Sequence, residues 1–200
     1  MNFFGKVILF SIMLVAFVAG ELRAISLENG EKNSFCINEI GIGSGYGWGG
    51  LKNSAEDLTV YPAFVRIGFN INSFVGIEGG QSLLQLALEP FVNGIDNPEL
   101  GVETGCGIGV RYLHDLSAPV DVFVEGSVAP MFLSIDTHEQ GKAGFNFLTQ
   151  IGAGFQYNLT GRTALFAGYR FRHLSHGGLA DRSNMGINSI AIVFGVSLLY

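Results

Sequence analysis

The sequence predicts an all-β protein, an eight-stranded antiparallel transmembrane β-barrel of the outer-membrane type, in a single domain. Only 14% of the 200 residues are charged and 48% are apolar, whereas a soluble domain usually carries about 25% charged residues. No apolar run after Val18 approaches the roughly 20 residues that a membrane-spanning helix needs. Short segments that alternate between apolar and polar residues, with one side facing lipid, account for both observations.

Residues 1–20 are expected to be a secretory signal peptide and not part of the fold. Met1–Lys6 is short with one positive charge, and Val7–Val18 is apolar and uncharged. Small residues follow, so cleavage is expected after Gly20 or after Ala24. The alternative is an uncleaved membrane anchor, but the apolar run is shorter than a spanning helix requires.

The barrel is expected to occupy residues 34–200. This part of the chain contains eight segments in which apolar and polar residues alternate with a period of two, as they do in half-exposed strands. In order along the chain, the predicted strands are Ser34–Tyr46, Leu58–Ile71, Val75–Phe91, Gly101–Leu113, Val120–Leu133, Gly144–Leu159, Thr163–Ser175 and Asn188–Tyr200.

The fourth, sixth and eighth segments alternate most clearly. The fourth has Cys106, Ile108 and Val110 on one face, and glycines with Glu103 and Arg111 on the other. Apolar side chains outside and glycine or charge inside is the pattern of a membrane barrel, the inverse of a soluble one. The eighth segment alternates up to an aromatic residue at the end of the chain, which resembles the assembly signal of outer-membrane proteins.

The links between segments agree with this topology. Asn72–Phe74, His114–Pro119 and Thr160–Arg162 are predicted to be short, whereas Gly47–Asp57 and His176–Ile187 are longer. Outer-membrane barrels have short periplasmic turns and longer outer loops, with both chain ends on the periplasmic side when the strand number is even. The seventh strand therefore runs outward and ends near the outer leaflet.

Charged residues that alternate with apolar ones are expected to point into the lumen and to pair there, without a catalytic role. A net charge of −6 argues against a nucleic-acid partner. Cys36 has no lipobox before it, so a lipoprotein is not expected. Cys36 and Cys106 lie on strands that would not be neighbours, and a disulfide needs Cα atoms within about 7 Å. The expected lumen residues are Arg66, Glu103, Arg111, Asp121, Glu125, Arg170 and Arg172.

Three polar residues are predicted to meet on the lipid-facing side at the outer end of the last two strands. Continuing the lipid-facing parity of the seventh strand places His173 and Ser175 on one face, about 7 Å apart between Cα atoms. The same parity on the eighth strand reaches Asn188, beside His173. Histidine can take the proton of a serine hydroxyl near neutral pH. The structural alternative is a polar rim, which is ordinary at the end of a barrel.

The run Arg170-Phe171-Arg172-His173-Leu174-Ser175, followed by Gly177-Gly178-Leu179 and Asn184-Met185-Gly186-Ile187-Asn188, resembles the signature of the PagL family of outer-membrane lipid A 3-O-deacylases. The resemblance implies that Ser175 is the nucleophile and His173 the general base. It also implies that Asn188 stands where the family has a glutamate that orients the histidine. The backbone N–H of Gly178 corresponds to a proposed oxyanion-hole donor.

The chain departs from the family signature at two positions. His176 replaces an asparagine that is a proposed oxyanion donor, and a histidine could donate through a ring N–H instead. Asn188 can orient a histidine, as asparagine does in Cys-His-Asn proteases, but it cannot supply a negative charge to the imidazolium. Asp181 in the loop is a possible substitute acid.

The resemblance implies a serine esterase that removes an ester-linked acyl chain from lipid A in the outer leaflet of the bacterial outer membrane, without metal or cofactor. The alternative is a non-catalytic barrel, either a degenerate relative or a structural or adhesive protein. A porin is disfavoured because eight strands leave an interior just wide enough for side chains.

Overall fold

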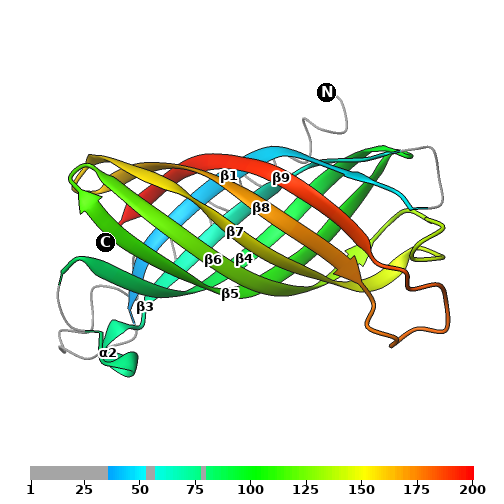
Figure 1. Cartoon of the computed structure of the whole chain (residues 1–200), viewed down its shortest axis with the longest axis horizontal. Coiled ribbons are helices and arrows are strands. Elements are labelled where there is room, and N and C mark those ends of the chain that lie inside the picture. Colours follow the sequence, from blue (N-terminus) through cyan, green and yellow to red (C-terminus); the bar gives the residue numbers. More distant parts are fainter. Residues whose placement is uncertain (1–35, 53–56, 78–79) are drawn as a thin grey trace.

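The computed structural model describes residues 36–52, 57–77 and 80–200, so the predicted signal peptide and its cleavage site lie outside the described residues. One antiparallel sheet, closed on itself, makes up most of this part of the chain (Figure 1). Its elements are β1 (Ile37–Gly50), β2 (Asp57–Tyr61), β3 (Ala63–Asn70), α2 (Asn72–Val75), β4 (Ser82–Asn97), β5 (Gly101–Ser117), β6 (Val120–Leu133), β7 (Gly144–Thr160), β8 (Thr163–Ser175) and β9 (Ile187–Leu199).

The nine labelled strands form an eight-stranded barrel, because β2 and β3 are two parts of one strand. Both pair with β1 on one side and with β4 on the other. Pro62 separates them, since proline has no N–H to give to the ladder. The barrel closes through antiparallel pairing of β1 with β9, with Gly43 opposite Gly195. The predicted fold class is confirmed.

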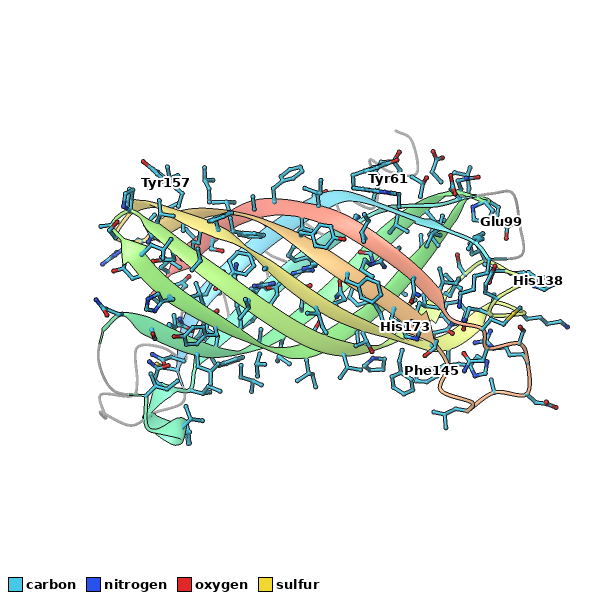
Figure 2. All side chains as sticks on the ribbon, viewed as in Figure 1. Tyr61, Glu99, His138, Phe145, Tyr157 and His173 are labelled. Atoms are coloured by element: carbon cyan, nitrogen blue, oxygen red, sulfur yellow. The ribbon has the colours of Figure 1, made fainter. Side chains whose placement is uncertain are left out.

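The outer surface of the barrel is apolar along the strands and aromatic near one end. Ile151 and Phe155, on one face of β7, are exposed, as the alternation of that segment implies. The rings of Tyr46 and Trp48 are stacked with centroids 5.6 Å apart, and Tyr46 packs edge-on against Tyr61 at 5.7 Å. Figure 2 shows Tyr61 on the outer side of the barrel. Such an aromatic girdle marks the level of the membrane–water interface.

The lumen holds a network of arginine–glutamate ion pairs at mid-height. Arg66 contacts Glu89 and Glu125 at 2.8 Å each, and Arg170 contacts the same two carboxylates at 2.6 and 2.7 Å. Arg111 adds a weaker contact with Glu125 at 3.7 Å. All of these side chains are buried or nearly so. The prediction of a paired internal network is therefore confirmed for the arginines and glutamates, with Glu89 as a member that was not predicted. Asp121, which was also expected in the lumen network, instead accepts hydrogen bonds from Gln156 and Asn158.

Two further ion pairs extend the lumen network toward the ends of the barrel. Glu39, also missed from sequence, pairs with Arg111 at 3.3 Å and accepts hydrogen bonds from Ser197 and Gln85. At the other end, Arg172 pairs with Glu103. Because each of these lumen charges has an opposite partner, the attraction within each pair offsets part of the cost of removing the charges from water.

Glycine in the lumen makes room for aromatic rings. A Cβ on Gly43 would lie 2.3 Å from the ring of Phe64, and one on Gly195 would lie 2.4 Å from the ring of Phe166. These two rings in turn pack with centroids 6.2 Å apart. The lumen is therefore filled by side chains, as expected for an eight-stranded barrel.

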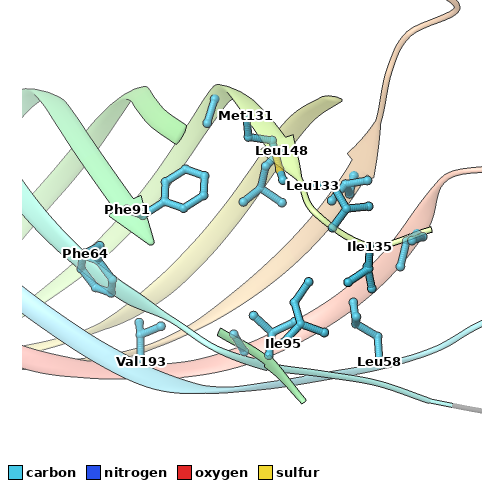
Figure 3. Packing of buried hydrophobic residues seen from close by; sticks show 14 of the residues in the cluster. Leu58, Phe64, Phe91, Ile95, Met131, Leu133, Ile135, Leu148 and Val193 are labelled. Atoms are coloured by element: carbon cyan, nitrogen blue, oxygen red, sulfur yellow. The ribbon is translucent and has the colours of Figure 1, made fainter. Parts of the chain in front are cut away.

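One end of the lumen is closed by an apolar cluster that the alternation pattern did not predict. It is built from inward-facing residues at the strand ends opposite the carboxyl terminus (Figure 3). This is the outer end, because even-stranded barrels keep both chain ends on the periplasmic side. The buried residues of this end include Leu58, Ile95, Leu133, Ile135, Leu148, Leu174 and Ile187.

The start of the third predicted strand was wrong. This strand was predicted at Val75–Phe91 after a short link, but β4 begins at Ser82 and residues 72–75 form the single turn α2. The apolar residues near Val75 give the sequence the pattern of an alternating strand. In the structure this region is the helical turn α2, on which Phe74 is exposed. This periplasmic link, residues 71–81, is therefore as long as the longest outer loop, residues 176–186.

Two further observations concern the predictions made from composition. Cys36 and Cys106 are free thiols, consistent with their positions next to β1 and on β5, which are not paired strands. Within the ranges that the structure covers, no helix has the length and apolar character needed to cross a membrane.

Candidate active site

The three predicted polar residues lie on the outer face of β8 and β9. His173 and Asn188 are direct partners in the antiparallel pairing of these strands. Ser175 is the last residue of β8 and lies opposite Phe147 of β7. Figure 2 shows His173 at the end of the barrel where the β8–β9 loop leaves the sheet. Strand register thus brings His173 and Asn188 into contact. Strand parity places Ser175 on the same face, two residues after His173.

The inward-facing neighbours hold this part of the sheet in place. Leu174, between His173 and Ser175, is only 3% exposed and pairs with Ile187, the residue before Asn188. Leu174 and Ile187 both belong to the apolar cluster at the outer end of the lumen. The site therefore lies on a packed strand pair, which positions side chains more rigidly than a loop does.

Asn188 fixes the orientation and the tautomer of His173. The histidine Nδ1 lies 2.6 Å from the Asn188 side-chain oxygen. An amide oxygen only accepts hydrogen bonds, so Nδ1 carries the proton and donates it. The lone pair of the neutral ring is then on Nε2, where a general base needs it. An asparagine at this position can therefore hold the imidazole through the same ring nitrogen that a carboxylate would bind.

The chain after Ser175 turns back tightly through two glycines. Gly177 and Gly178 have φ values of 61° and 77°, a left-handed conformation that glycine adopts without steric cost. The Leu179 N–H donates to the His176 carbonyl at 3.0 Å and closes the turn. Successive positive φ values at the two central positions are typical of a type I′ turn. The backbone N–H of Gly178, the expected oxyanion donor, thus lies in an exposed turn three residues after Ser175.

The structure places His176 inside the loop and not beside Ser175. The residue is 1% exposed. Its Nε2 lies 2.9 Å from the Ser183 carbonyl, to which it donates, and its Nδ1 accepts the Ala180 N–H at 3.4 Å. With its ring N–H already bound, His176 does not offer the oxyanion donor that the sequence analysis considered. It supports the loop instead.

Removing the His176 ring should loosen this loop. In His176→Ala the two ring hydrogen bonds are lost, at about 1 kcal/mol each. We expect the open population of the loop to rise roughly 5- to 30-fold, and tryptic cleavage after Arg182 to accelerate by the same factor. Limited proteolysis of the folded barrel measures this. His138→Ala, which alters an exposed residue of the neighbouring β6–β7 loop, is the control and should leave the cleavage rate unchanged.

The β8–β9 loop is also tied to the neighbouring outer loops. The Met185 N–H donates to the Glu139 carbonyl at 2.8 Å, and Arg182 donates to the Phe145 carbonyl at 2.5 Å. Lys52, after β1, donates to the Met185 carbonyl at 3.1 Å. Contacts from two other loops therefore restrain the segment that follows the serine.

Asp181 is exposed in this loop. The histidine nitrogen that a substitute acid would have to bind, Nδ1 of His173, is already bound by Asn188. The geometry therefore favours Asn188 as the orienting group. In the described residues no group of three or more His, Cys, Asp or Glu side chains is placed to hold a metal ion.

The fold is that of an outer-membrane-type barrel. Its lipid-facing rim carries a histidine and a serine, which together form a candidate hydrolytic site at the membrane surface. The family model described as lipid A 3-O-deacylase (PagL) matches residues 41–197. The chain belongs to the PagL family and is a protein of the bacterial outer membrane.

Comparison with solved structures agrees on the fold. The crystal structure of the outer membrane enzyme PagL matches with a TM-score of 0.59 at 16% identity, covering 78% of this chain and 97% of that chain. Neisserial surface protein A (NspA) matches with a TM-score of 0.58 at 16% identity, covering 81% of this chain and 96% of that chain. At these identities the likeness shows the fold alone. A search of the curated proteins found no match.

Proposed function

We propose that the chain is a serine esterase that removes the 3-O-linked acyl chain from lipid A in the outer leaflet. The observation that carries the proposal is the hydrogen bond of 2.6 Å from His173 Nδ1 to Asn188, on the face that also bears Ser175. This bond leaves Nε2 as the free base. Membership of the PagL family supports the choice of lipid A as substrate.

In the first half of the proposed reaction, Ser175 attacks the ester carbonyl carbon of the 3-O-linked chain. His173 Nε2 takes the hydroxyl proton as the new C–O bond forms. The carbonyl oxygen becomes an oxyanion, to which the Gly178 N–H donates a hydrogen bond. The tetrahedral intermediate then breaks its bond to the sugar oxygen, which leaves with the proton held by His173.

In the second half, water releases the acyl chain from Ser175. His173 Nε2 takes a proton from the water, whose oxygen attacks the acyl carbonyl carbon. The serine oxygen leaves and recovers the proton from His173, and the fatty acid is released. The two halves need the same base, the same oxyanion donor and no redox partner.

The height of the site in the membrane suits an ester of a membrane lipid. Trp48, a member of the aromatic girdle, is paired with Ile190, two residues from Asn188. The site therefore lies at the edge of the girdle, where the acyl chains of a lipid join its headgroup. A substrate already in the outer leaflet can reach the site by lateral diffusion, without an enclosed pocket.

The proposal is tested with the folded protein in detergent micelles and purified lipid A. We expect release of one fatty acid per lipid A molecule, with the same rate in the presence of a chelator. Absence of release from a barrel that is folded, as shown by heat-modifiable mobility on gels, would favour the non-catalytic alternative.

We expect kcat for fatty-acid release to depend on how well residue 188 orients and stabilises His173. For Asn188→Ala we expect kcat to fall about 100-fold, because the ring loses its orienting bond. Asn188→Glu should match or exceed the native kcat, since a carboxylate also stabilises the imidazolium in the transition state. Initial rates of fatty-acid release measure both. An alanine variant as active as the native protein would contradict the role given to Asn188.

A further inference from the structure

Gly186 lies directly against the ring of His173. A Cβ at residue 186 would lie 2.7 Å from Cε1 of the imidazole, and 3.4 and 3.6 Å from Nε2 and Nδ1. Distances below about 3 Å are too short for a carbon–carbon contact. The φ of Gly186 is 71°, a conformation that residues with a Cβ rarely adopt. The imidazole therefore occupies space that is available only because residue 186 has no side chain.

The backbone at this position is held from both sides. The preceding residue, Met185, donates its N–H to the Glu139 carbonyl at 2.8 Å, and its carbonyl accepts from Lys52 at 3.1 Å. These partners belong to the β6–β7 loop and to the segment after β1. Gly186 itself is buried. The backbone beside the imidazole is thus held by hydrogen bonds to two segments outside the β8–β9 hairpin.

A single hydrogen bond to Asn188 does not by itself hold a histidine ring. The torsion that rotates the ring has broad minima, and His173 projects from the barrel toward lipid and not into a packed core. A second contact against the ring limits that rotation. In the structure this second contact is the Gly186 backbone.

We propose that Gly186 is a positioning residue for His173: its missing side chain admits the imidazole, and its anchored backbone holds the ring in the orientation that keeps Nδ1 on Asn188. The inference rests on the proposed function in that His173 is the base whose orientation matters. The orientation itself can be measured without any reaction.

Gly186→Ala tests this most directly, and the chain offers two matched controls. Gly177→Ala introduces a side chain at φ 61° in the same loop, and Gly76→Ala does so at φ 70° after α2. At both positions a Cβ would meet nothing within 4 Å. The controls share the backbone strain but not the contact with His173.

The main readout is nitrogen NMR of the histidine rings in the folded barrel, with the His173 signal assigned through a His173→Gln variant. We expect the native protein, Gly177→Ala and Gly76→Ala to show the Nδ1-protonated tautomer of His173. In Gly186→Ala the two nitrogen signals should move toward the average of both tautomers. In the same variant kcat should fall about 100-fold, as expected for a displacement of about 1 Å, while KM stays within about threefold.

Native-like His173 signals together with a native kcat in Gly186→Ala would overturn the proposal. If that variant does not fold, Lys52→Met removes the anchor of Met185 without adding strain, and it should move the His173 signals in the same direction. Unchanged signals in Lys52→Met would then overturn it. If the native protein itself releases no fatty acid, the proposed function fails, and the NMR comparison still decides whether Gly186 positions His173.

Discussion

Ser175→Ala should abolish deacylation while leaving the barrel folded. The hydroxyl is the only group lost, and the rest of the proposed site keeps its structure. Because the covalent step has no substitute nucleophile, we expect the rate to fall at least about 1,000-fold. The residual activity, if any, would come from substrate binding and the oxyanion donor. The rate of fatty-acid release from purified lipid A measures the effect.

A matched control for this variant is Thr149→Ala. Thr149 lies on β7 directly opposite His173 and is exposed on the same outer face. It carries a hydroxyl at the same height as the site, but the proposed mechanism gives it no role. We expect near-native rates. Equal loss in the two variants would show that any hydroxyl near His173 matters and would argue against Ser175 as the nucleophile.

Arg170→Leu should have the largest effect on stability. Arg170 bridges two buried carboxylates, at 2.6 Å to Glu89 and 2.7 Å to Glu125, and its guanidinium lies 4.6 Å from the ring centroid of Phe64. Removing it leaves a surplus negative charge in the lumen. Breaking a buried ion pair in this way costs about 3–5 kcal/mol. The free energy of unfolding, from denaturant titration in detergent or lipid, should fall by that amount.

Two comparison variants separate charge imbalance from loss of side-chain packing. Arg162→Leu, in the exposed β7–β8 turn, should change the free energy of unfolding by less than about 1 kcal/mol. Arg170→Leu combined with Glu89→Leu removes a charge of each sign and should recover much of the lost stability. A double variant less stable than Arg170→Leu alone would contradict the view that the unpaired carboxylate is the main cost.

The barrel could be predicted from sequence because its main physical signal is simple. Lipid outside and a narrow lumen inside impose alternation with a period of two, which β7 and β9 show along most of their length. The alternation does not predict the structure where a different physical constraint determines the backbone. At α2, Val75 was predicted to begin a strand, although it is the last residue of a helical turn. At Pro62 the strand is interrupted because proline has no backbone N–H.

The lumen was predicted only in part. Arg66, Arg111 and Arg170 were assigned to it from their position in the alternation, and their pairing is confirmed. Glu39 and Glu89 were missed, although each occupies an inward position on its strand. Both lie inside the predicted first and third segments, so the ranges themselves did not exclude them. The apolar closure of the outer end has no signature in alternation, because it depends on which strand ends converge in space.

The candidate site combines local and non-local information. Parity along β8 and β9 sufficed to place His173 beside Asn188, since antiparallel register follows from a hairpin. The inward turn of the His176 ring was not predictable, because its partners, Ser183 and Ala180, follow in an irregular loop. Gly186 was noted only as part of a motif. Its contact with His173 required the three-dimensional path of the loop.

Mass spectrometry of lipid A from bacteria that express the native chain or Ser175→Ala tests the proposed deacylation in the membrane itself. We expect lipid A to lose one ester-linked acyl chain, from position 3, only in cells with the native serine. Lipid A of unchanged mass, in cells whose outer membrane contains both folded barrels, would contradict it.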